Sequence, residues 1–262
     1  MKITIITVVR NGINTIKDTI DCVLSQSYSN IEYIIIDGCS TDGTVDVIKS
    51  YGNKITKFIS EKDKGIYDAM NKGLRLATGD YIGFLNSDDF YMHPYVIDKI
   101  VEQARVTQAD ALYGDLIYVD PNDTNRLLRY WRAGDFDRFK MLFGWSVPHP
   151  TFFVKRRIFT DFGLFRENFK ISGDYEMMVR FFFKGRISAA YIPEILVKMR
   201  AGGMGNASMK ARMIANREDM YAWRCNGLNT SMFTVLVKPL RKIPQFIARP
   251  NTTLLPEFSE VV

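Results

Sequence analysis

Cysteine and histidine are scarce in this chain of 262 residues, which holds three cysteines and two histidines. The cysteines, Cys22, Cys39 and Cys225, stand far apart in the sequence and form no CxxC pair. An odd, scattered set argues against a disulfide framework and against a zinc cluster. We therefore expect free thiols and a reducing, cytoplasmic compartment.

Long apolar runs are absent too. No segment stays apolar over the roughly 20 residues that a membrane-spanning helix needs, and the strand-like residues 1–9 show no signal-peptide cleavage pattern. The next four residues, Arg10-Asn11-Gly12-Ile13, lack the G-x-G-x-x-G of dinucleotide-dependent dehydrogenases. They also lack the glycine-rich loop with arginine and lysine that sugar nucleotidyltransferases carry after their first strand. Both enzyme classes are therefore disfavoured.

The bulk composition is ordinary for a globular protein, with 47% hydrophobic and 24% charged residues. The length fits one large α/β domain, or such a domain with a smaller appended segment. The formal net charge of +6 suggests an anionic partner, which leaves open a nucleotide, a phospholipid surface, a pyrophosphate-linked acceptor or nucleic acid.

Short β-branched runs alternate with helical patterns in the first half of the chain. Buried strands are predicted at residues 3–9, 31–36, 55–60 and 81–85, and helices at residues 15–26, 44–51, 66–76 and 94–107. Asn14 is predicted to cap the first of these helices, and Pro94 to open the last one. This alternation predicts a mostly parallel, Rossmann-like sheet flanked by helices.

The second half of the chain is less regular. Strands are predicted at residues 111–119, 152–154 and 187–192, and helices at residues 174–184 and 208–225. Ligands of doubly wound sheets bind at the carboxyl ends of the strands. Polar residues follow four of the predicted strands at this end: Arg10 and Asn11, Asp37, residues 61–64, and Asp88 with Asp89. These clusters predict a ligand site at one edge of the sheet.

Four aspartates, at three places in the sequence, carry carboxylates that suit chemistry. Asp88 and Asp89 are adjacent after a buried strand, where they could hold Mg²⁺ or Mn²⁺, although helix capping is an alternative. Asp37 could accept a hydrogen bond from a base or a ribose, or could serve the turn in which it lies. Asp174 begins an apolar helix, where it could take a proton from an attacking hydroxyl or act as a simple cap.

The order and spacing of several motifs resemble family 2 glycosyltransferases, which have the GT-A fold. The resemblance covers about residues 1–205. It rests on the opening strand at residues 3–12, on Asp-Gly-x-Ser-Thr-Asp-Gly-Thr at residues 37–44, on residues 63–73, on Leu85-Asn86-Ser87-Asp88-Asp89 and on Gly173-Asp174. Residues 63–73 are similar to the donor-side loop and helix of members that assemble polysaccharides such as O-antigens.

The resemblance implies a role for each matching residue. On the donor side, Thr7, Val9 and Arg10 would line the base pocket, Asp37 would bind the base, and Lys64 and Gly65 would border the nucleotide. Asp88 would contact the ribose or donor sugar, and Asp89 would bind Mn²⁺ or Mg²⁺. Asp174 would be the general base. The family inverts the anomeric centre in one displacement. The implied donor is a UDP-sugar, with GDP- and dTDP-sugars as alternatives.

The resemblance also implies a division of the chain. Residues 1–110 would bind the nucleotide sugar, residues 111–205 would form the acceptor side, and residues 206–262 would form a helical extension. The implied acceptor is a saccharide, lipid-linked in some members, and no nucleic acid is expected. The tail mixes apolar residues with basic ones, which suggests peripheral contact with the inner face of the cell membrane or, alternatively, a packing helix. The apolar residues are Phe233, Leu236, Leu240, Phe246 and Ile247, and the basic residues are Lys238, Arg241, Lys242 and Arg249.

Two departures from the family pattern stand out. Asn86 replaces the first aspartate of the metal motif, and residues 199–204 lack a histidine that many relatives use as a metal ligand. Arg200 could instead bind the pyrophosphate directly. His149 could line the acceptor site or be structural, and Trp131 and Trp145 are better explained by packing than by sugar stacking.

A non-enzymatic alternative is a degenerate domain that binds sugar nucleotides or assembles a complex. The joint presence of Asp37, Asp88, Asp89 and Asp174 speaks against it, because a scaffold needs no such set.

Overall fold

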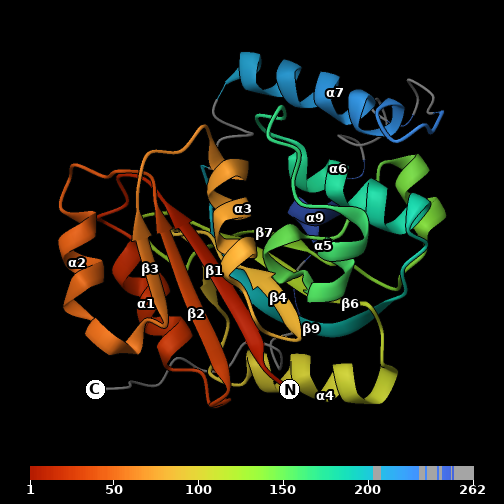
Figure 1. Ribbon diagram of the computed structural model, residues 1–262. Helices are drawn as coiled ribbons and strands as arrows, with labels where there is room; N and C mark the ends of the chain where they lie inside the picture. The colour runs from red at the N-terminus through yellow and green to blue at the C-terminus, as the bar shows by residue number, and fades with distance from the viewer. Residues whose placement is uncertain (203–207, 230–233, 235–240, 242–243, 249, 251–262) are drawn as a thin grey trace.

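The computed structural model describes residues 1–202, 208–229, 234, 241, 244–248 and 250, and its centre is a sheet of nine strands (Figure 1). The strands are β1 (Ile3–Val9), β2 (Ile31–Asp37), β3 (Lys57–Ser60), β4 (Tyr81–Phe84), β5 (Phe90–Tyr91), β6 (Ala111–Val119), β7 (Leu127–Trp131), β8 (Phe153–Lys155) and β9 (Ala189–Arg200). Their order is β3-β2-β1-β4-β8-β6-β9-β5, with β7 paired to β6.

Most of the pairing in this sheet is parallel. The strands β3, β2, β1 and β4 run parallel to one another, as do β6 and β9. The short β8 is antiparallel to both β4 and β6, and it joins the two parallel parts. The predicted α/β fold with a mostly parallel sheet is therefore confirmed.

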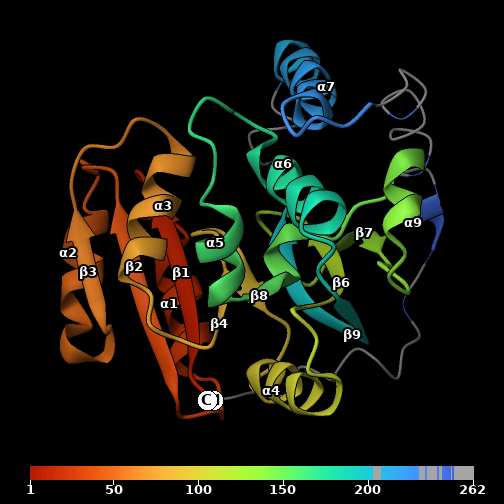
Figure 2. The same cartoon turned by 45° about the vertical axis from the view of Figure 1, so that its right-hand side comes forward.

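Helices cover both faces of the sheet (Figures 1 and 2). They are α1 (Ile16–Leu24), α2 (Thr44–Ser50), α3 (Ile66–Leu76), α4 (Val96–Thr107), α5 (Arg156–Phe162), α6 (Gly173–Val179), α7 (Met209–Arg224) and the short α9 (Pro244–Ile247). Short 3₁₀ turns span Gly52–Lys54, Arg138–Phe143 and His149–Thr151, and a π turn, Arg180–Lys184, continues α6.

The alternation of side chains along β1 builds two cores. Ile6 and Val8 belong to the core that contains residues of α3, α5, α6 and α7. Ile3 and Ile5 belong to the core on the opposite face, with residues of α1, α2 and α4. Because successive side chains of a strand point to opposite faces, an almost continuous apolar run is what a strand buried on both faces requires.

The helix α7 is part of the first core rather than an addition at its edge. Its Ala222 and Trp223 are buried there, and Trp223 Nε1 donates to the hydroxyl of Tyr175 in α6 at 3.1 Å. Both views place α7 beside α6 (Figures 1 and 2). The predicted boundary at residue 205 stays a prediction.

Two details of the helix ends differ from the sequence prediction. The cap position of α1 is Thr15, without a side-chain hydrogen bond, so the prediction that Asn14 caps this helix is wrong. The helix α4 begins at Val96, two residues after Pro94, so Pro94 precedes the helix instead of opening it. The three cysteines are free, as predicted, and no helix among the described residues is long and apolar enough to cross a bilayer.

Candidate active site

The loops that follow β1 and β2 are bound to each other. The backbone N–H groups of Asn11, Gly12 and Ile13 donate to the side chains of Ser40 at 2.7 Å, Thr44 at 2.9 Å and Asp42 at 3.0 Å. Asp42 also accepts from the backbone N–H of Thr44 at 3.0 Å. Asp42 and Thr44 thus serve turn and capping geometry, and the polar residues after the first two strands are held at one edge of the sheet.

Asp37 is completely buried at the end of β2. Its carboxylate accepts hydrogen bonds from the backbone N–H of Ser40 at 3.0 Å, from the hydroxyl of Ser60 at 2.7 Å and from the hydroxyl of Ser40. These bonds fix the carboxylate between the ends of β2 and β3. Whether Asp37 also binds a base stays a prediction.

Arg10 and the loop after β3 meet over Gly38. A Cβ at Gly38 would lie 2.2 Å from the carboxylate of Asp63 and 3.4 Å from Cδ of Arg10. Asp63 in turn accepts from the backbone N–H of Gly65 at 3.0 Å. Glycine at position 38 therefore allows the predicted base-pocket residue Arg10 to approach the loop that contains Lys64 and Gly65.

The other predicted donor-side residues differ in exposure. Lys64 and Gly65 are exposed, and the backbone N–H of Lys64 donates to Asp68 at 2.9 Å. Thr7 has no exposed surface and accepts from the hydroxyl of Tyr33 at 3.2 Å, while Val9 packs in the core beside α1. The accessible part of this strand end begins at Arg10.

The adjacent carboxylates of Asp88 and Asp89 have different surroundings. Asp89 is completely buried, and it accepts from the Asn86 side-chain amide at 2.8 Å and from the backbone N–H of Arg200 at 3.3 Å. Asp88 keeps part of its surface exposed. Asp88 is therefore the member of the pair that faces solvent, and Asp89 lies behind it.

Burial raises the pKa of both carboxyl groups, and the charge of Asp88 raises the pKa of Asp89 further. A bound cation would offset this repulsion between the two carboxylates. The described residues contain no group of three or more His, Cys, Asp or Glu side chains arranged to hold a metal. A pair of carboxylates completed by substrate phosphates and water is a donor set that fits Mg²⁺ or Mn²⁺.

Arg200 is buried beside this pair. Its guanidinium donates to the carbonyl of Asp88 at 2.7 Å, forms an ion pair with Asp18, and lies 5.0 Å from the ring centre of Phe90. These contacts give Arg200 the role of a positive charge that supports the Asp88–Asp89 turn from inside. Its predicted contact with a pyrophosphate stays a prediction.

Asp174 lies in the first turn of α6, partly exposed, beside the amino-terminal end of α3. The hydroxyl of Tyr67 in α3 accepts from the backbone N–H groups of Gly173 at 2.7 Å and Asp174 at 3.4 Å. The helix that follows the donor-side loop therefore contacts the helix that carries the candidate base. Tyr67 lies within the motif at residues 63–73, but nothing in the linear pattern marked it as a partner of residues 173 and 174.

His149 is buried between aromatic rings near the end of β4. Its ring centre lies 5.5 Å from that of Phe84 and 6.0 Å from that of Phe165. Burial lowers its pKa, while the charge of Asp174 acts in the opposite direction, and its Nε2 has no hydrogen-bond partner among the described residues. The ring therefore packs in the core, and its role towards an acceptor stays a prediction.

The two tryptophans that the sequence assigned to packing have different surroundings. Trp145 is buried and donates to the carbonyl of Ala133 at 2.8 Å, as the packing interpretation predicts. Trp131 lies beside Arg129, whose guanidinium carbon is 5.5 Å from its ring centre. Of the predicted tail residues, Phe233, Leu236, Lys238, Leu240, Lys242 and Arg249 lie outside the described residues.

Comparison with known proteins identifies the family. The sequence profile described as "Glycosyl transferase family 2" matches residues 4–169, which is more than half of the chain. The chain belongs to glycosyl transferase family 2. The transferase is 28% identical over 195 residues to a "PGL/p-HBAD biosynthesis glycosyltransferase" of Mycobacterium bovis, and this match covers 71% of this chain and 72% of the relative.

Solved structures share the fold of the transferase. S. aureus TarS 1-349 in complex with UDP-GlcNAc matches with a TM-score of 0.69 at 15% identity, over 91% of this chain and 70% of that one. The mannosyltransferase PcManGT of Pyrobaculum calidifontis, in complex with GDP-Man and Mn²⁺, matches with a TM-score of 0.64 at 15% identity, over 92% and 69%. The family 2 resemblance and the GT-A type of fold are therefore confirmed.

Proposed function

We propose that this glycosyltransferase moves a sugar from a UDP-sugar to a hydroxyl of a saccharide acceptor, with inversion and with the help of Mn²⁺ or Mg²⁺. The observation that carries the proposal is a series of contacts that links four segments: Arg10 and Asp63 meet at Gly38, Gly12 lies beside Ser87, and Tyr67 binds Gly173. The four segments are the loop after β1 with Arg10, the loop with Lys64 and Gly65, the Asp88–Asp89 turn, and the start of α6 with Asp174.

The choice of donor draws support from the structural neighbours. The TarS fragment is bound to UDP-GlcNAc, and the mannosyltransferase is bound to GDP-Man and Mn²⁺. A GDP-sugar is therefore the second candidate donor, and a dTDP-sugar the third. Arg10, Asp37, Lys64 and Gly65 are proposed to bind the nucleotide, with Thr7 and Val9 behind them in the wall of the base pocket.

The proposed reaction is a single displacement. The acceptor oxygen attacks the anomeric carbon, the bond from this carbon to the diphosphate oxygen breaks on the opposite face, and the hydroxyl proton passes to Asp174. Asp88 contacts the ribose or the donor sugar. A divalent cation, held by Asp89 and Asp88 together with the phosphates, would offset the charge that develops on the leaving diphosphate.

The acceptor is proposed to be a saccharide in cell-surface polysaccharide assembly, carried on a lipid. The name of the mycobacterial relative supports a biosynthetic glycosyltransferase. Membrane contact through the tail is part of the same proposal, and sedimentation with vesicles that contain phosphatidylglycerol, compared with neutral vesicles, tests it. Absence of binding to both kinds of vesicle would contradict membrane contact.

A donor panel tests the central proposal. Protein with Mn²⁺ or Mg²⁺ is mixed with UDP-, GDP- and dTDP-sugars, and the release of nucleotide is followed with water as acceptor. We expect slow release from one donor, abolished by chelator, by Asp89→Ala and by Asp174→Ala. Calorimetry accompanies the panel, because the alternative of an inactive binding module predicts donor binding without release. If no nucleotide sugar binds in the presence of metal, the proposal is wrong.

A further inference from the structure

The segment that leads into α6 has an unusual set of hydrogen-bond partners. Five successive backbone N–H groups, at residues 170–174, donate to just two side chains from other helices. The carboxylate of Glu218 in α7 accepts from Lys170 at 2.8 Å, Ile171 at 2.9 Å and Ser172 at 2.8 Å. The hydroxyl of Tyr67 in α3 accepts from Gly173 at 2.7 Å and from Asp174 at 3.4 Å.

Glu218 occupies the kind of backbone concavity that usually binds an anion. Successive N–H groups that converge on one point favour negative charge, and hydrogen bonds to a carboxylate are about twice as strong as neutral ones. Because Glu218 lies in α7, its hydrogen bonds hold the backbone of residues 170–172 against this helix. Ser172 Oγ adds a further contact, since it donates to the carbonyl of Ala215 in α7 at 3.3 Å.

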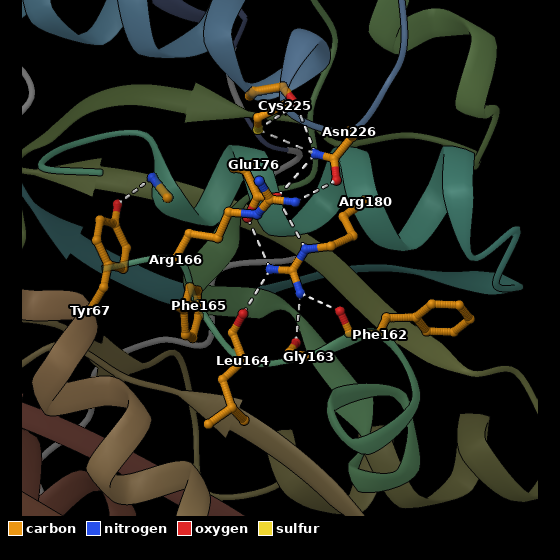
Figure 3. A network of polar contacts seen from close by, with 12 residues as sticks. Tyr67, Phe162, Gly163, Leu164, Phe165, Arg166, Glu176, Arg180, Cys225 and Asn226 are labelled. Carbon is orange, nitrogen blue, oxygen red and sulfur yellow. Dashed lines mark hydrogen bonds and ion pairs between the residues drawn. The ribbon is translucent and has the colours of Figure 1, made fainter. Parts of the chain in front are cut away.

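Tyr67 fixes the next residues from the other side. Its hydroxyl donates to the carbonyl of Ile171 at 2.7 Å while it accepts from Gly173, and its ring is buried against Phe165, with 5.5 Å between the ring centres. A Cβ at Gly173 would lie 2.6 Å from the ring of Tyr67. Glycine at position 173 therefore permits the close approach that this hydrogen bond requires. Figure 3 shows Tyr67 reaching across to this segment.

We propose that Tyr67 and Glu218 are positioning residues that hold Asp174 in its place for catalysis. The inference rests on the proposed function of Asp174 as the base. Tyr67 lies two residues after Gly65, so the helix that begins at the donor-side loop also sets the position of the base. A misplacement of about 1 Å in a reacting group costs on the order of 100-fold in rate.

A pair of phenol-to-phenyl variants separates positioning from general packing. Tyr67→Phe removes the hydroxyl that binds the segment before Asp174. Tyr175→Phe is the matched control, because this hydroxyl lies on the neighbouring residue of α6, is equally buried and binds Trp223 instead. Glu218→Gln keeps the size of the side chain but replaces one acceptor oxygen with a donor.

The readouts are UDP affinity by calorimetry with Mn²⁺, turnover of the donor that the panel selects, and amide hydrogen exchange of residues 170–174. We expect Tyr67→Phe and Glu218→Gln to lower turnover about 10-fold to 100-fold, to leave the Kd for UDP unchanged, and to speed exchange in this segment. Tyr175→Phe should leave turnover and exchange there at the wild-type level.

Two results would overturn the inference. One is an equal loss of turnover in Tyr67→Phe and Tyr175→Phe, and the other is unchanged exchange at residues 170–174 in both Tyr67→Phe and Glu218→Gln. Failure of the proposed function looks different, because wild-type protein would then release no nucleotide from any donor. In that case the exchange data still decide whether Tyr67 and Glu218 hold the segment.

Discussion

Asp88 and Asp89 are neighbours in sequence, but their carboxylates differ in burial and in hydrogen bonding. Asp89 is buried and accepts two hydrogen bonds, whereas Asp88 is partly exposed. Each carboxylate oxygen of Asp89 accepts from one donor, so asparagine would turn its NH2 group toward one of them, which should cost about 1–3 kcal/mol of unfolding free energy. Asp88→Asn should leave the unfolding free energy within about 0.5 kcal/mol.

Both variants should lose the gain in UDP affinity that Mn²⁺ provides, because one negative charge is removed from the pair in each case. Urea unfolding and calorimetry with and without Mn²⁺ measure the two effects. The raised pKa of both carboxyl groups adds a pH dependence, since a metal binds the ionised form: the effect of Mn²⁺ should grow as the pH rises. Retention of the full Mn²⁺ effect in both variants would exclude this pair as the cation site.

His149 makes the stability of the protein sensitive to acid. Burial lowers the pKa of its imidazole in the folded state, so below about pH 6.5 the unfolded chain binds a proton that the folded protein does not. Stability should therefore fall as the pH drops through this range. His149→Phe removes the titrating group and keeps a ring beside Phe84 and Phe165.

Urea unfolding at pH 7.5 and pH 5 tests this expectation. We expect His149→Phe to lose less stability than wild type between the two values. His93→Gln is the control, because burial also lowers the pKa of His93. This variant measures how much His93 contributes to the loss of stability in acid. An identical acid-induced loss in wild type and His149→Phe would contradict the argument.

At the scale of the single residue, the sequence predicted the carboxylates of the site but not the residues whose hydrogen bonds hold the site in place. Asp37, Asp88, Asp89 and Asp174 follow strands or open a helix, and such positions show in a linear pattern. Glu218 gives no such signal, because its three hydrogen bonds join residues that lie 46 to 48 positions apart along the chain. A partner at that distance depends on how the helices pack, and one sequence does not reveal this packing.

Among the elements, the junction of β4 and β8 depends on a glycine. Gly83 pairs with Phe153, and a Cβ at Gly83 would lie 2.4–2.8 Å from three atoms of that buried ring. Gly83→Ala forces the ring to move, which should destabilise the protein by about 1–3 kcal/mol. This junction joins the two parallel parts of the sheet.

A double-mutant cycle with Phe153→Leu checks the stated cause. The smaller side chain alone leaves a cavity, but it makes room for the added methyl group. The double variant should therefore unfold at a higher urea concentration than the sum of the two single effects predicts. Strict additivity would mean that the ring of Phe153 is not what opposes a Cβ at position 83.

Elements with a clear period were predicted within two or three residues at most ends, and the strands β5 and β7 and the helix α5 were missed. The apolar runs of β1, β2 and β6 are buried on both faces, so composition alone marks them. The strand β5 has two residues, too few for a period, and α5 begins with two arginines that hide its apolar side. The last strand extends past Pro193 to Arg200, although proline usually ends such a pattern.

For the whole molecule, one buried charge joins segments that are distant in the sequence. Glu176 has no exposed surface, and it binds Arg180 at 3.0 Å and 2.9 Å, Arg166 at 3.1 Å and the side-chain amide of Asn226 at 3.0 Å. Arg180 also donates to the carbonyls of residues 162–164 at 2.6–2.8 Å. Figure 3 shows these groups converging on Glu176. The cluster spans the predicted boundary at residue 205.

Glu176→Gln should lower the free energy of unfolding by about 3–5 kcal/mol, because it leaves the guanidinium of Arg180 buried without its counter-charge. Lys99→Gln is the control: it removes a partly exposed ion pair with Glu194 and should cost less than about 1 kcal/mol. If α7 and the sheet form one cooperative unit, circular dichroism and tryptophan fluorescence should report a single urea transition in wild type, and Glu176→Gln should shift both signals together. Two separate transitions, with just one of them moved by Glu176→Gln, would mean that the chain after residue 205 unfolds on its own, and Asn226 would then not be held by Glu176 as part of the main core.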